Sequence, residues 1–177
     1  MTRNPLLLVF LGLALVLTGC GNRSIGNKID DQFLGPRVLS RIHNANPELV
    51  APTSRVVVTA YNGVILLAGQ TPRADLRDQA EQAARLVVGV KKVHNELQIQ
   101  QPASALARSN DALLTTRVKS SMLTTNNLAS SNIKVITENG VVYLMGIVSR
   151  QQADLATSAA QKVGGVQRIV RLFQYTD

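Results

Sequence analysis

The sequence contains few of the residues that carry redox chemistry, metal binding and base stacking. It has one cysteine, two histidines and no tryptophan, and aromatic residues make up 3% of its 177 positions. A single cysteine excludes a structural disulfide within the chain. The shortage of aromatic platforms argues against a single-strand nucleic-acid binder. The composition therefore argues against a redox function and against nucleic-acid binding.

Catalytic signatures are also missing. The serine pairs at 120–121 and 130–131 lie outside any G-x-S-x-G context, and the glycines fall at expected turns and helix ends rather than in a phosphate-binding loop. No convincing cluster of carboxylates accompanies His43 or His94, so neither predicts a metal site. We expect no catalytic residue, no metal and no cofactor, and we predict that the protein is not an enzyme.

Acidic residues are scarce relative to basic ones. The chain has 19 Lys and Arg against 11 Asp and Glu, for a formal net charge of +8. This balance favours an anionic partner, such as lipid head groups, nucleic acid or an acidic protein surface. The export signal described next argues against nucleic acid.

The one long apolar run lies at the N-terminus. Leu6 to Leu17 spans 12 residues, which is too short to cross a bilayer as a helix but suits the apolar region of a signal peptide. The run continues into Leu17-Thr18-Gly19-Cys20, which resembles a bacterial lipobox; the alternative is a short membrane anchor with an incidental cysteine. The resemblance implies a signal peptide over 1–19 and diacylation of Cys20, including palmitate. Because Gly21 rather than Asp follows the cysteine, it also implies a lipid-anchored protein at the periplasmic face of the outer membrane.

Two polar stretches without apolar periodicity divide the rest of the chain. Residues 20–30 predict an acylated, flexible tether, and residues 101–109 a linker. The intervening segments, 31–100 and 110–177, are predicted to be two domains.

Each predicted domain contains nearly the same eight letters. Residues 62–69 read NGVILLAG and residues 139–146 read NGVVYLMG. The dipeptides Asn62-Gly63 and Asn139-Gly140 are favoured in a tight type I′ hairpin turn. We therefore predict two hairpins whose returning strands end at the final glycine of each stretch.

Helical periodicity flanks each hairpin. In the second copy Leu114, Val118 and Met122 recur at i, i+4 and i+8 after a cap at Asn110 or Asp111. After each hairpin an Ala-rich helix runs into Gly-Val, and a last strand follows. The prediction is an α+β fold of two consecutive αββαβ modules, each with two helices on a three-stranded mixed sheet. Modules this small gain stability by packing together, so we expect one compact rod or wedge.

This order resembles a pair of BON domains. The motif N-G-x-(V/I)-x-L-x-G, a polar helix and then G-V-(K/Q)-(K/R)-(V/I) occur twice, behind a lipobox. The resemblance is to the dual BON-domain outer-membrane lipoproteins. It implies binding of anionic phospholipid, such as phosphatidylglycerol or cardiolipin, through the first helix of the second module. It also implies support of envelope integrity, including at cell division sites.

Residue positions on that helix agree with a lipid contact. Leu113 lies off the core stripe, with Arg117 and Ser120 on its own side and Lys119 as a second cation. An apolar side chain beside cations is the arrangement of a small interfacial anchor. Alternatively, Leu113 packs against the other module and the cations are simply solvated. The competing function is a membrane-tethered adaptor for another envelope or outer-membrane assembly protein.

Overall fold

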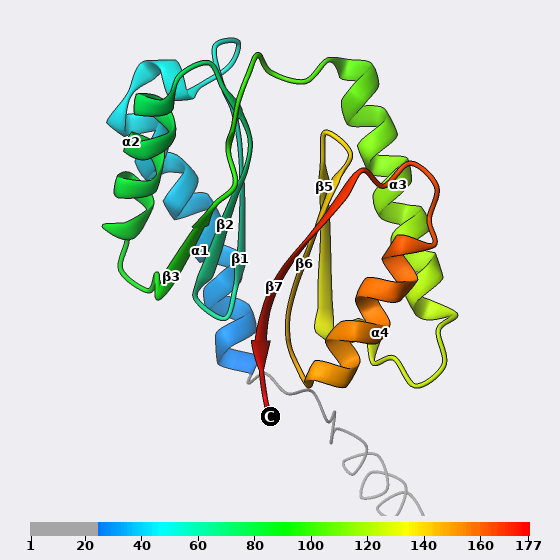
Figure 1. Ribbon diagram of the computed structural model, residues 1–177. Helices are drawn as coiled ribbons and strands as arrows, with labels where there is room; N and C mark the ends of the chain where they lie inside the picture. The colour runs from blue at the N-terminus through cyan, green and yellow to red at the C-terminus, as the bar shows by residue number, and fades with distance from the viewer. Residues whose placement is uncertain (1–24) are drawn as a thin grey trace, which may run out of the picture.

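The computed structural model describes residues 25–177. The predicted signal peptide and Cys20 lie outside the described residues. The described chain forms two consecutive α+β units, each in the order helix, strand, strand, helix, strand (Figure 1). This confirms the predicted fold class.

The first unit comprises α1 (Ile25–Ala45), the 3-10 helix η2 (Pro47–Leu49), β1 (Arg55–Tyr61), β2 (Val64–Thr71), α2 (Ala74–Arg85), β3 (Lys92–Asn95) and β4 (Gln98–Ile99). The second comprises α3 (Ala105–Leu123), the 3-10 helix η3 (Ser130–Asn132), β5 (Ile133–Glu138), β6 (Val141–Val148), α4 (Arg150–Gln161) and β7 (Arg168–Tyr175).

Both sheets are mixed and have the same topology. In the second unit β6 lies in the centre, antiparallel to β5 and parallel to β7. In the first unit β2 is antiparallel to β1 and parallel to both β3 and β4. The last strand is divided here because Leu97 turns into the core, where it is 4% exposed, while the Glu96 N–H donates to the Leu67 carbonyl at 2.9 Å. The sheet thus has three strand positions, one of them interrupted.

The repeated eight letters form a hairpin turn and most of a strand. Asn62 and Gly63 have φ of 52° and 79°, and Asn139 and Gly140 have 49° and 74°, the positive values that a type I′ turn requires.

The expectation that the returning strands end at Gly69 and Gly146 is wrong, because β2 continues to Thr71 and β6 to Val148. A Cβ at Gly69 would collide with the Arg55 carbonyl, and one at Gly146 would lie 2.7 Å from the Asn132 carbonyl oxygen. These glycines therefore allow the neighbouring chain to approach closely inside the sheet.

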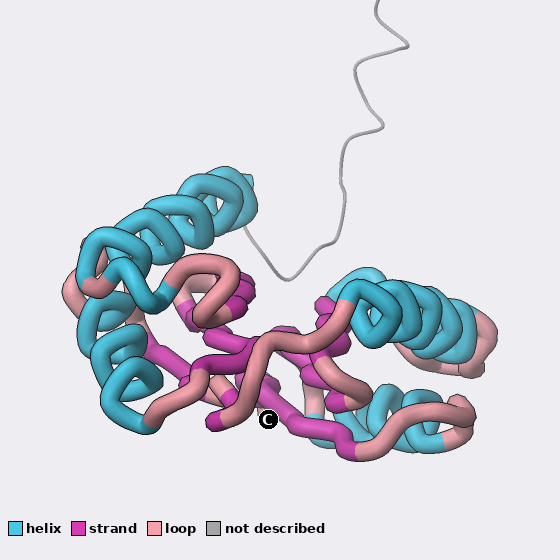
Figure 2. The backbone as a smooth tube through the Cα atoms, turned by 90° about the horizontal axis from the view of Figure 1, so that it is seen from above, coloured by secondary structure: helices cyan, strands magenta, loops and turns pink. Residues whose placement is uncertain are grey.

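The two sheets pack face to face between outer layers of helices (Figure 2). One face of each sheet meets its own two helices; Leu114, Val118 and Met122 of α3 are buried there as predicted. The other faces meet each other in a third cluster that includes Tyr61 and Tyr143. Because both faces are covered, every residue of β2 is buried.

Two polar contacts between the units lie at equivalent positions of the repeat. Arg55 Nε donates to Glu138 Oε1 at 2.8 Å, and Tyr61 Oη donates to the Asn132 carbonyl oxygen at 2.8 Å. Arg55 and Asn132 each precede the strand residue that pairs with the repeated glycine. The interface is therefore arranged like that of a two-fold symmetric dimer.

This symmetry places corresponding features at opposite ends of the molecule. Because the start of β1 meets the end of β5, and the end of β1 meets the start of β5, the two strands run in opposite directions across the interface. The 62–63 turn consequently lies at the end where α1 begins, and the 139–140 turn at the other end (Figure 1).

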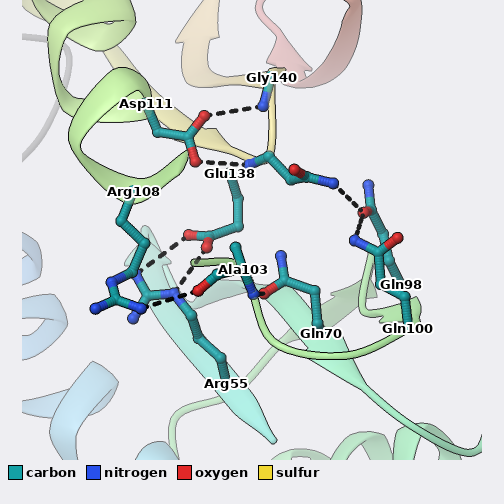
Figure 3. A network of polar contacts seen from close by, with 10 residues as sticks. Arg55, Gln70, Gln98, Gln100, Ala103, Arg108, Asp111, Glu138 and Gly140 are labelled. Carbon is teal, nitrogen blue, oxygen red and sulfur yellow. Dashed lines mark hydrogen bonds and ion pairs between the residues drawn. The ribbon is translucent and has the colours of Figure 1, made fainter. Parts of the chain in front are cut away.

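Two helices begin earlier along the chain than expected. α1 begins at Ile25, so residues 25–30 of the expected tether are helical. α3 begins at Ala105, so residues 105–109 of the expected linker are helical too. The residue before Ser104 contacts both units, since the Ala103 N–H donates to Gln70 Oε1 of β2 at 3.0 Å and its carbonyl oxygen accepts from Arg108 of α3 at 2.9 Å (Figure 3).

Candidate functional site

The helix that carries the predicted site is longer than the sequence interpretation assumed. Ser104 is its N-cap, and the serine hydroxyl accepts from the Ala107 N–H at 3.2 Å. The predicted cap at Asn110 or Asp111 is therefore wrong. A side-chain oxygen that accepts a free N–H of the first turn fixes a helix start, and no proline or glycine follows before Leu123.

Asp111 has a different role, which the sequence analysis missed. Its side chain is in the middle of α3 and accepts from the Asn139 N–H at 2.7 Å and the Gly140 N–H at 2.9 Å (Figure 3). Asp111 is 7% exposed. The carboxylate ties the hairpin turn to the helix through two charge-assisted hydrogen bonds.

The first unit has the same connection. Asp31 of α1 accepts from the Asn62 N–H at 2.6 Å and from the Gly63 N–H at 3.0 Å. The two aspartates lie at different distances along the chain from their turns, 31 residues in one unit and 28 in the other. A search for repeats at one fixed spacing therefore does not align them.

Leu113 and Arg117 lie together beside this turn. They line a shallow hollow of about 350 Å³, with Asn110, Gly140 and Gln167 among its other lining residues. Leu113 is 57% exposed, and α3 belongs to an outer layer (Figure 2). Leu113 therefore does not pack against the first unit, which was the alternative considered from the sequence.

The remaining predicted contacts divide between two sides of α3. Ser120 is exposed and lies two turns after Leu113, on the same side. Lys119 is about 240° around the helix from Leu113 at about 100° per residue, and it lines a separate hollow with Leu123. The predicted second cation therefore lies apart from the other three residues on the helix surface.

Leu106 joins the site unexpectedly. It is 71% exposed and, seven residues before Leu113, lies on the same side of the helix. It was missed because the helix was expected to begin after it; the signal was Ser104, a favoured capping residue ahead of an alanine-rich start. We define the α3 surface as Leu106, Leu113, Arg117 and Ser120.

The α3 surface is neither part of a membrane span nor a metal centre. Within residues 25–177 no helix is both long and apolar enough to cross a bilayer. Over the same range His, Cys, Asp and Glu side chains do not gather into a group suited to a metal ion. The α3 surface offers exposed leucines, one cation and polar groups around a hollow.

Comparison with known proteins identifies the class that this architecture defines. The BON domain family matches residues 37–101 and again residues 110–177. The chain therefore belongs to the BON domain family and carries the domain twice, in a family of lipoproteins rather than of enzymes.

Particular relatives extend the comparison beyond the domains. Over 195 aligned positions, which cover 100% of both proteins, the chain is 35% identical to the outer membrane lipoprotein DolP of Haemophilus influenzae. It is 34% identical over 153 residues to the 21 kDa hemolysin of Actinobacillus pleuropneumoniae, covering 86% of this chain and 78% of the relative. It is 28% identical over 148 residues to the osmotically-inducible protein Y of Escherichia coli, covering 82% and 72%. The predictions of a dual BON-domain lipoprotein and of outer-membrane localisation are confirmed.

Proposed function

We propose that this outer-membrane lipoprotein binds anionic phospholipid, phosphatidylglycerol or cardiolipin, through the α3 surface of its second BON domain. The observation that carries the proposal is the position of Leu106 and Leu113, both largely exposed, on the side of α3 that also presents Arg117. Exposed leucines can enter the boundary between head groups and acyl chains, while a cation contributes about 1 kcal/mol near an anionic surface.

The hollow beside Leu113 supports recognition of a head group. Its lining includes the side chains of Asn110, Arg117 and Gln167, which supply hydrogen-bond donors for phosphate and hydroxyl oxygens. Asp111 also lines it, but both of its oxygens accept from the turn. The carboxylate is thereby oriented toward backbone N–H groups.

The predicted acyl group on Cys20 makes a modest affinity sufficient. An anchored chain presents its binding surface to the membrane at a high effective concentration, so a weak second contact is occupied without new interactions. We further propose that this contact supports envelope integrity, including at division sites, as the family resemblance implies.

Vesicle co-sedimentation tests the proposal. The mature chain with Cys20→Ser is mixed with phosphatidylglycerol, cardiolipin or phosphatidylcholine vesicles. We expect binding to the anionic vesicles only. It should weaken as salt rises from about 0.1 M to about 1 M, because the screening length falls from about 10 Å to about 3 Å.

Matched variants on α3 make the test specific. Leu113→Ser and Arg117→Glu should reduce binding, whereas Leu123→Ser and Lys119→Glu, the same changes on another side of the helix, should not. Equal losses in all four variants would point to non-specific attraction. If the parent and all variants are folded and none binds any vesicle, lipid binding is excluded. The alternative function, a membrane-tethered adaptor for another protein, would then be favoured.

A further inference from the structure

The first unit has a surface equivalent to the α3 surface. Since Asp31 and Asp111 hold equivalent turns, α1 can be aligned with α3 at these residues. Phe33 then corresponds to Leu113, and Arg37 to Arg117. A hollow of about 250 Å³ lies beside Arg37 and the 62–63 turn, as the other lies beside Arg117.

The surface of the first unit is the more apolar of the two. Phe33 is 62% exposed, and in the loop after α2 Leu86 and Val88 are 70% and 85% exposed. At the positions of Leu86 and Val88 the second unit has Lys162 and Gly164. Val88 lines the hollow with Arg37, and Leu86 lines another hollow with Arg41. Exposed apolar side chains along a helix and the loop that packs beside it indicate an interaction surface.

Cations follow the apolar side chains along α1. Arg37 and Arg41 lie one and two turns after Phe33 on the same side of the helix, and both are exposed. Lys91, also exposed, lines the hollow with Arg37 and Val88. Asp30 is the opposing charge at the edge of the hollow, since Asp31 is bonded to the turn. We define the anchor-side patch as Phe33, Arg37, Arg41, Leu86, Val88 and Lys91.

The patch lies next to the predicted membrane anchor. Cys20 precedes Ile25, the first residue of α1, by a stretch that spans at most about 18 Å. Phe33 lies about 12 Å further along the helix. The 139–140 turn, beside the α3 surface, is at the opposite end of the molecule, separated by about the 20 Å length of β1.

We propose that the anchor-side patch rests on the anionic surface of the membrane that holds the acyl chains. Phe33 and Val88 enter the interface, and Arg37, Arg41 and Lys91 contact lipid phosphates. A lipid surface is favoured because the exposed apolar side chains of a loop and a helix are bordered by cations. The acyl anchor on Cys20 would also hold this end of the molecule close to the membrane. The inference rests on acylation at Cys20 but does not depend on lipid binding by the α3 surface.

Depth measurement tests the orientation in the acylated protein. Acylation consumes the only cysteine, so Val88→Cys and Gly164→Cys each introduce one thiol, at equivalent positions of the two units. The acylated variants carry a fluorescent label in phosphatidylglycerol-containing vesicles with quenchers on the acyl chains. We expect strong quenching at position 88, and weak quenching there overturns the proposal. Gly164 lines the hollow of the α3 surface, so quenching at position 164 reports separately on membrane contact by that surface.

Binding of the non-acylated chain separates this inference from the proposed function. On a Cys20→Ser background, Phe33→Ser should weaken binding to phosphatidylglycerol vesicles by about tenfold or more, and Arg37→Glu by about tenfold. Leu123→Ser, which also removes an exposed apolar side chain, is the control.

Leu113→Ser and the Phe33→Ser/Leu113→Ser double variant complete the set. Loss with Phe33→Ser alone supports the anchor-side patch and counts against the α3 surface. Loss with Leu113→Ser alone overturns the patch and leaves the proposed function. If each single variant binds less and the double variant binds less than either, both surfaces are supported. If vesicle binding is unchanged in all three variants, both proposals are overturned.

Discussion

Replacing Asp111 with alanine should destabilise the second unit without touching its apolar core. The change removes a carboxylate that is 7% exposed and accepts two backbone N–H groups of the Asn139-Gly140 turn. The turn holds both residues at positive φ, so the bonds fix the position of an unusual backbone conformation against α3.

The magnitude follows from the burial of each bond. A hydrogen bond to a charged group contributes about 1.5–3 kcal/mol. The Gly140 N–H bond is buried and the Asn139 N–H bond only partly so, so water can replace part of the second. We expect a loss of about 2–4 kcal/mol in the free energy of unfolding. For a chain of this size that corresponds to a fall in Tm of about 4–16 °C.

Urea and thermal denaturation, followed by circular dichroism on the mature chain with Cys20→Ser, provide the measurement. Asn110→Ala is the control, because Asn110 is exposed and its loss should change the free energy by less than about 0.5 kcal/mol. Asp111→Asn keeps one acceptor oxygen and should lie between the two. An Asp111→Ala protein within about 0.5 kcal/mol of the parent would refute the reasoning.

Other predictions concern the interface, the sheet and pH. Arg55→Gln should cost about 1–3 kcal/mol, because it leaves the Glu138 carboxylate, 5% exposed, without its partner; the estimate is reduced because Arg55 is 36% exposed. A double-mutant cycle with Glu138→Gln measures the coupling, and a coupling near zero would contradict the assignment. Gly146→Ala should destabilise by about 1–3 kcal/mol through the Asn132 contact, as measured by its urea midpoint. A change of less than about 0.5 kcal/mol would show that the sheet accommodates the methyl group. Burial and then nearby Lys92 lower the pKa of His94 below its usual 6.5, so the unfolded chain binds the proton more readily and stability should decline as pH falls below that value. His94→Gln should flatten this decline in urea midpoints between about pH 5 and pH 7; an unchanged slope would exclude His94 as its source.

The fold could be predicted because its signals are local. Asn-Gly followed by apolar letters specifies a hairpin from neighbouring residues alone, and the stripe at Leu114, Val118 and Met122 identifies the buried side of a helix. The packing of the two sheets had a weaker signal. The run VILLAG in β2 lacks the alternation of a half-exposed strand, and its continuous apolar character indicated cover on both faces.

The site could be predicted only in part, because its geometry depends on long-range contacts. Leu113 and Arg117 were identified from their positions relative to the core stripe. The hydrogen bonds of Asp111 join residues that are 28 and 29 positions apart in the sequence. Local periodicity cannot predict such long-range contacts. Leu106 was missed because the helix was expected to begin after it.

The symmetric interface also bears on self-association. A surface that matches its own repeat could in principle pair with a second molecule. In a pairing of two first units Arg55 would meet Tyr61 instead of a carboxylate, and in a pairing of two second units Glu138 would face the carbonyl oxygen of Asn132, acceptor against acceptor. The differences at these positions favour packing of the two units of one chain against each other over packing of like units from two chains.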